Sequence, residues 1–109
     1  MAELLPCPCL GAAVELTEER EGHISSGHPE LGVRPVDVLA RVLADPDTVR
    51  QDSRFPDTWL FSRWLPDLLD GKHIVVAVVT DTGPPVRYWV VTAYATRRVT
   101  RGEIVWQRS

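Results

Sequence analysis

The feature that most constrains the fold is a run of apolar, mostly β-branched residues, HIVVAVVT, from His73 to Thr80. A continuous apolar run of this length predicts a strand that is buried on both faces. Residues 86–95 (VRYWVVTAYA) predict a second long strand, and only the short loop 81–85 separates the two. A connection this short forces antiparallel pairing, because parallel strands need a long crossover. The chain is therefore expected to form a sheet around these two strands.

Two helices are expected before this sheet. Thr17 is a plausible N-cap, and acidic residues then occupy the first turn of a helix that ends at Gly27. Pro35 suits the first position of a second helix, because its fixed backbone angle matches the helix and its missing N–H is not needed there. The apolar stripe of that helix consists of Val38, Leu39, Val42 and Leu43. The second helix should end at Asp45, because the residue before a proline avoids the helical region.

Shorter segments complete the expected sheet. Residues 12–16, 59–64 and 104–106 have strand-like composition, and Asp70-Gly71 indicates a hairpin turn. The order of elements predicts an α+β fold, in which an antiparallel β-sheet of about four strands carries N-terminal helices packed on one face. The chain has 109 residues, so residues 1–109 are expected to form a single domain.

Charge is distributed unevenly along the chain. Six acids and one base fall within residues 1–30, whereas five bases and one acid fall within residues 87–109. The net charge of −3 does not favour nonspecific nucleic-acid binding. The basic C-terminal segment either presents a phosphate-facing patch or is a solvated strand edge that resists aggregation. No run approaches the ~18 apolar residues that span a bilayer, and no signal peptide is recognisable. We therefore expect a cytoplasmic protein with no membrane partner.

Both cysteines lie in the tripeptide Cys7-Pro8-Cys9. A bridge between residues so close in sequence would be strained, so reduced thiols are expected. The two thiols either are small apolar groups or chelate a metal together with His23 or His28. Zinc requires four ligands, and no complete ligand pattern is present in the sequence. We therefore expect no metal and no cofactor, and retain a small metal-binding protein as an alternative.

A row of hydroxyl-bearing side chains is expected on the strand 86–95, continued by Thr96. Strict alternation places Tyr88, Thr92, Tyr94 and Thr96 on one face of this strand. Such a row either supplies hydrogen-bond donors to a cleft or is an ordinary amphipathic solvent face. No nucleotide-binding glycine loop, zinc-protease motif or esterase elbow is present. These absences argue against ordinary NTPases, dehydrogenases and esterases.

Histidines and arginines supply the remaining candidates for chemistry. His23 and His28 flank the expected end of the first helix, with several glutamates nearby, and histidine suits proton transfer near neutral pH. Arginines from different strands would stabilise the extra negative charge of a pentavalent phosphate if they converged on one sheet face. The alternative for the arginines is surface solubilisation. The candidates are Arg54, Arg63, Arg87 and Arg97.

Four segments together resemble a known superfamily. They are LTEEREGHISSGHPEL, VLADPDTVRQDSR, KHIVVAVVT and VRYWVVTAYATRRVTRGEI. Their order, with His-x₄-His-Pro-Glu, Asp-Pro-Asp and Thr-Ala-Tyr, is similar to that of phage- and toxin-associated nuclease-like domains of the barnase, EndoU, colicin and RelE superfamily. The similarity runs from about Leu16 to Ile104. It implies a helical N-terminal part packed on an antiparallel sheet.

The resemblance also implies metal-independent cleavage of RNA, in which the ribose 2′-hydroxyl attacks the adjacent phosphate and leaves a cyclic phosphate. The implied partners are RNA, including tRNA, and a cognate antitoxin or immunity protein. The alternative is a catalytically inactive binding or assembly module of the same fold. The implied catalytic residues are His23 or His28 at the histidine motif, Thr92 and Tyr94 on the strand, and Arg54 or Arg63 at the central basic position. The residues expected in substrate binding are Tyr88, Arg87, Thr96 and Arg97.

Overall fold

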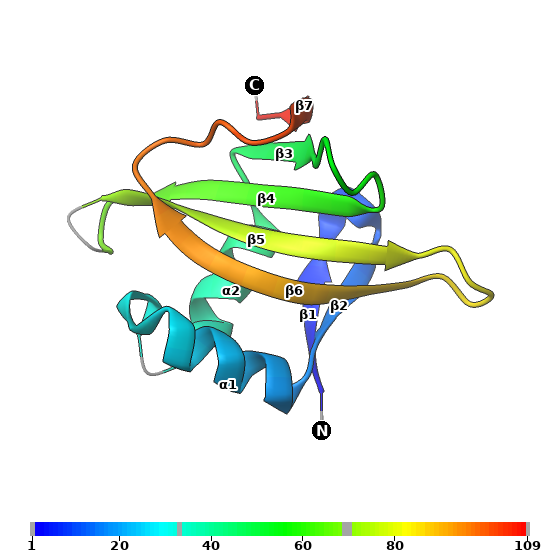
Figure 1. The fold of residues 1–109 in the computed structure, drawn as a ribbon, viewed down its shortest axis with the longest axis horizontal. Coiled ribbons are helices and arrows are strands. Elements are labelled where there is room, and N and C mark those ends of the chain that lie inside the picture. The colour runs from blue at the N-terminus through cyan, green and yellow to red at the C-terminus, as the bar shows by residue number, and fades with distance from the viewer. Residues whose placement is uncertain (1, 33, 69–70, 109) are drawn as a thin grey trace.

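The computed structural model describes residues 2–32, 34–68 and 71–108. Within these ranges the chain forms one mixed sheet, two α-helices and two short 3₁₀ segments (Figure 1). The helices are α1 (Glu18–Gly27) and α2 (Pro35–Ala44), and the 3₁₀ segments are η1 (Pro8–Leu10) and η2 (Pro29–Leu31). The strands are β1 (Glu3–Cys7), β2 (Ala12–Leu16), β3 (Thr48–Gln51), β4 (Thr58–Leu65), β5 (Lys72–Asp81), β6 (Arg87–Thr96) and β7 (Glu103–Gln107).

Both helices form where the sequence predicts them, for the expected local reasons. The hydroxyl of Thr17 accepts a hydrogen bond from the backbone N–H of Arg20 at 3.1 Å, which caps α1. Pro35 occupies the first turn of α2, and the apolar stripe of this helix is buried. Asp45 follows the last helical residue, as expected before Pro46. The helix α2 therefore contributes most of the helical part of the core.

The sheet differs from the one that we predicted. Among the described residues it has seven strands in the order β1-β2-β6-β5-β4-β3-β7, and it is mixed, because β2 and β6 are parallel neighbours through the pair Glu15 and Trp89. The prediction of a four-stranded antiparallel sheet with N-terminal helices is therefore wrong. Two strands precede the helices, and the helical segment α1–α2 belongs to the long crossover that a parallel pair requires. The predicted pairing of β5 with β6 is antiparallel, as expected.

The strands that we did not predict, β1 and β3, are short edge or near-edge elements. Strand β1 pairs with β2 as a hairpin, and it includes Pro6, a residue that sheets tolerate only near their edges. Strand β3 (TVRQ) is half polar and lies between β4 and β7. Neither segment has the apolar alternation that indicates a strand. The predicted hairpin turn at Asp70-Gly71 includes Asp70, which lies outside the described residues.

The two faces of the sheet have different surroundings. One face packs against α1 and α2, and its core includes Phe61, Ile74, Val76 and Val78 (Figure 1). We call this the helix face. The opposite, open face carries a smaller apolar cluster of Leu60, Val75 and Ala77, on which Val99 packs. No helix in the described part of the chain is long and apolar enough to cross a membrane.

Candidate functional site

A cavity of about 370 Å³ lies on the open face of the sheet. We call it the open-face pocket. Its floor is apolar, and polar side chains stand at its edges, which is the usual make-up of a site for a small organic group. The lining residues are Asp52, Phe55, Asp57, Thr58, Leu60, Ala77, Val79, Val91, Thr92, Tyr94 and Arg101.

The loop between β3 and β4 forms one wall of this pocket and is organised by Asp52. This carboxylate is buried, and it accepts hydrogen bonds from the backbone N–H groups of Arg54 at 2.8 Å and Phe55 at 3.3 Å. It also forms an ion pair with Arg101 at 2.8 Å. Burial favours the neutral form of Asp52, but the backbone N–H groups and Arg101 outweigh it and hold the pKa of the carboxyl below its ordinary value.

A bulge in β6 decides which side chains enter the pocket. Ala77 pairs with Thr92 but the next residue, Val78, pairs with Val90, so Val91 is an extra residue in the ladder. Val91 and Thr92 therefore both line the open-face pocket. Tyr88, on the other side of the bulge, packs against the core of the helix face.

The predicted row of hydroxyl side chains is therefore broken. Thr92 and Tyr94 lie on the open face, and Thr96 shares that face through its pairing with His73, but Tyr88 does not. The prediction of a single four-residue row is wrong, because strict alternation does not continue through a bulge. The Thr96 hydroxyl donates a hydrogen bond to the Arg98 carbonyl and accepts one from the Arg98 N–H, so it stabilises the turn that follows β6.

His28 and Tyr94 lie next to each other, with ring centroids 6.4 Å apart. The backbone of His28 is fixed at the end of α1, because its N–H donates to the Ile24 carbonyl at 2.8 Å and its carbonyl accepts from Leu31 at 3.0 Å. The ring Nδ1 lies 3.2 Å from the Glu30 carboxylate. An ionised carboxylate only accepts hydrogen bonds, so Nδ1 carries the proton and Nε2 is left as the basic atom.

The other predicted catalytic residues lie apart from this pair. His23 is exposed on α1, and its side chain makes no hydrogen bond or ring contact within the described part of the chain. Arg54 is exposed in the β3–β4 loop rather than on a strand, and only its backbone N–H is engaged, by Asp52. Of the two predicted histidines, the described contacts therefore bring His28 to Tyr94 and leave His23 apart.

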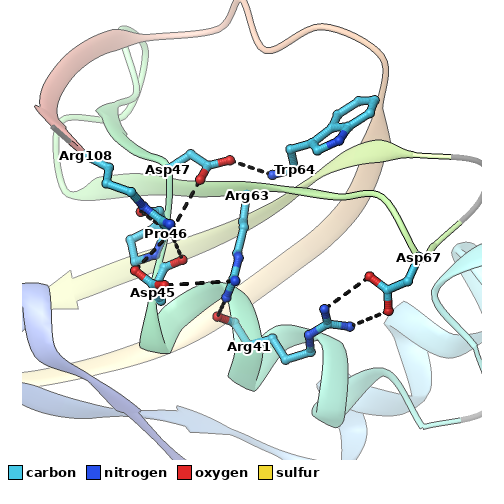
Figure 2. Close-up of polar contacts among 8 residues, drawn as sticks. All are labelled: Arg41, Asp45, Pro46, Asp47, Arg63, Trp64, Asp67 and Arg108. Atoms are coloured by element: carbon cyan, nitrogen blue, oxygen red, sulfur yellow. Dashed lines mark hydrogen bonds and ion pairs between the residues drawn. The ribbon is translucent and has the colours of Figure 1, made fainter.

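Arg63 and Arg87 are held by structural contacts. Figure 2 shows Arg63 against the end of α2, where it donates to the Arg41 carbonyl at 3.3 Å and lies 3.9 Å from Asp45. Arg63 pairs with Ile74, a residue of the helix-face core, so it projects away from the open face. Arg87 forms two hydrogen bonds with Glu15, at 2.8 and 2.9 Å. The predicted arginines do not converge on one face.

A second cavity, of about 250 Å³, contains positive charges that our sequence reasoning mostly missed. We call it the arginine pocket. Among its residues only Arg97 was a candidate from the sequence. The sequence feature that could have indicated this pocket is the pair of adjacent arginines, Arg97 and Arg98, at the end of a strand. The lining residues are Asp47, Thr48, Arg50, Ser62, His73, Arg97, Arg98 and Val99.

The cysteines occupy different environments at the N-terminal hairpin. Cys7 is buried in β1, and burial raises the pKa of its thiol to about 11. Cys9 is exposed in η1, and its pKa is also raised. In residues 2–32, 34–68 and 71–108, no group of three or more His, Cys, Asp and Glu side chains is arranged to hold a metal ion.

Comparisons of this chain with protein-family models, with curated proteins and with solved structures found no match.

Proposed function

We propose that this protein is a metal-independent endoribonuclease that cleaves RNA by attack of a ribose 2′-hydroxyl on the adjacent phosphate. The observation that carries the proposal is the contact between His28 and Tyr94, two residue types suited to proton transfer, beside a cavity on an open sheet face. The resemblance of the histidine motif and of Thr-Ala-Tyr to nuclease-like domains supports the same reaction.

The roles follow from the chemistry of each side chain. Glu30 orients His28, so that Nε2 takes the proton from the 2′-hydroxyl as the oxygen attacks phosphorus. The bond from phosphorus to the 5′-oxygen breaks, the leaving oxygen takes a proton from solvent water, and His28 releases the proton that it accepted to solvent. The products are a 2′,3′-cyclic phosphate and a 5′-hydroxyl. The Tyr94 hydroxyl donates a hydrogen bond to a phosphoryl oxygen, where negative charge develops.

The open-face pocket supports an RNA substrate because it suits a nucleobase. Tyr94 and Phe55 offer aromatic surfaces, and the floor of Leu60, Ala77 and Val79 is apolar. Proteins that recognise single-stranded RNA stack unpaired bases on aromatic side chains in this way. The hydroxyl of Thr92 and the carboxylate of Asp57, both at the pocket, supply hydrogen-bonding groups to the edges of a base.

The test is cleavage of RNA, including tRNA, by the purified protein in EDTA, with the product ends identified. We expect cyclic phosphate ends, and a loss of about 10²–10⁴-fold in rate for His28→Ala. Tyr94→Phe should slow the reaction by about 10²–10³-fold, the usual effect of removing one donor to a developing oxyanion. His23→Ala is the matched control and should retain its rate.

Two results would contradict the proposal. One is RNA that stays intact at high protein concentration, and the other is cleavage that survives both His28→Ala and Tyr94→Phe. RNA that is bound but not cleaved would instead identify the alternative, a binding module of the same fold.

A further inference from the structure

The arginine pocket lies on the open face, near Tyr94 of the proposed catalytic pair. His73 lines this pocket, and it pairs across the sheet with Thr96, two residues beyond Tyr94. Two residues along a strand correspond to ~6.6 Å. An RNA strand whose scissile phosphate lies at Tyr94 therefore places a neighbouring part of its backbone close to this pocket.

The positive charges of the pocket are not neutralised by carboxylates within it. In the described part of the chain, the guanidinium groups of Arg97 and Arg98 have no ion-pair partner. The one carboxylate in the lining, Asp47, is already engaged by the backbone N–H of Trp64 at 2.7 Å and by Arg108 at 3.4 Å (Figure 2). The pocket therefore has an excess of positive charge.

Arg50 adds a donor that the protein does not satisfy. Its Nη1 donates to the Gly102 carbonyl at 3.3 Å, but its Nε is buried and has no hydrogen-bond partner among the described residues. A buried donor without a protein partner is unfavourable, and a bound water or ligand oxygen can satisfy it. The hydroxyls of Thr48 and Ser62, 2.6 Å apart, also line this cavity.

This set of groups suits a phosphate. Guanidinium groups form several charge-assisted hydrogen bonds with phosphate oxygens, and hydroxyls add neutral ones. We propose that the arginine pocket is a phosphate subsite that binds an RNA backbone phosphate adjacent to the scissile one. This proposal rests on the proposed ribonuclease function. It adds that the arginine pocket binds the phosphate backbone of the RNA substrate.

The test measures binding without cleavage. The probe is a fluorescent 2′-O-methyl RNA decanucleotide, which lacks the free 2′-hydroxyl that the reaction needs. Its affinity is measured across a salt series for the wild type and for the double variant Arg97→Ala/Arg98→Ala. The matched control is Arg20→Ala/Arg34→Ala, which removes the same charge from residues that do not line the pocket.

We expect the Arg97→Ala/Arg98→Ala variant to bind ~10-fold or more weakly, the usual effect of losing charged hydrogen bonds. The slope of log affinity against log salt should decrease by about 0.7 for each phosphate that the variant no longer neutralises, whereas the control should keep its slope. In cleavage assays the double variant should raise KM and retain kcat, because these arginines hold the phosphate equally before and during the reaction.

The proposal is overturned if the two double variants bind equally, or if the wild type does not bind the probe. Thermal unfolding of each variant shows whether a loss of binding reflects a loss of folding, and both arginines are exposed, so the fold should be retained. If the probe binds through these arginines but natural RNA is never cleaved, the ribonuclease proposal fails and the phosphate site stands.

Discussion

Replacing Asp52 by alanine should destabilise the protein by about 3 kcal/mol. The carboxylate accepts two backbone N–H bonds in a buried position, and a hydrogen bond to a charged acceptor contributes about 1.5 kcal/mol net at the lower end of its range. The side chain of Arg101 is half exposed, so its ion pair adds at most about 0.5 kcal/mol. The loss is large against a typical unfolding free energy of about 5–15 kcal/mol.

Urea unfolding followed by tryptophan fluorescence measures this effect. Asp57→Ala, an exposed carboxylate of the same loop, is the control and should change the free energy of unfolding by no more than about 0.5 kcal/mol. A loss below about 1 kcal/mol for Asp52→Ala, or an equal loss in the control, would refute the assignment of Asp52 as the organiser of this loop.

The same carboxylate predicts a pH dependence. The pKa of Asp52 is lower in the folded protein than its ordinary value of 3.8, so its contribution is complete above that value and is lost as the pH falls through the folded pKa. The stability difference between the wild type and Asp52→Asn should therefore be largest at neutral pH and shrink as the pH falls below 3.8. A difference that stays constant as the pH falls below that value would contradict the lowered pKa.

Three further predictions concern the scaffold. Thr17→Ala should cost about 1 kcal/mol in urea unfolding because α1 loses its N-cap, whereas Ser26→Ala should cost less. Gly102→Ala should destabilise the protein, because Gly102 has φ +81 and an added Cβ would lie 2.5 Å from the Gln51 carbonyl oxygen. Gly22 lies on α1 with open space around it, so Gly22→Ala should instead stabilise the protein by about 0.5–1 kcal/mol. Iodoacetamide should alkylate the exposed Cys9 well before the buried Cys7, as followed by mass spectrometry, and equal rates would contradict the burial of Cys7.

The parts of the fold that could be predicted are those with strong local signals. Thr17 and Pro35 mark where the helices begin, and the apolar run of β5 identifies a central strand. The parallel pairing of β2 with β6 has no such signal, because it depends on contacts between segments far apart in the chain. Strand β3 is held by its neighbours β4 and β7 rather than by its own composition.

For the candidate site, the sequence indicated residue types more than their arrangement. His28 and Tyr94 stood out because a histidine at a helix end and a tyrosine on a long strand are recognisable from sequence. The bulge at Val91 was not recognisable, because Val90 and Val91 both suit a strand on either face. The role of Arg63 was also hidden, since only the packing of α2 places the Arg41 carbonyl beside it.

The strand order also has a consequence for how the molecule folds and opens. In the β4–β5–β6 meander, short loops connect the paired strands. Long stretches of chain separate β2 from β6 and β3 from β7, so these two pairings form at a greater entropic cost. These outer pairings should form last and open first. The segment 97–102 runs from β6 to the exposed edge strand β7, and it contributes Arg97 and Arg98 to one pocket and Arg101 to the other (Figure 1). Release of β7 alone would therefore loosen the segment that supplies arginines to both pockets, while the core between the sheet and the helices stays folded.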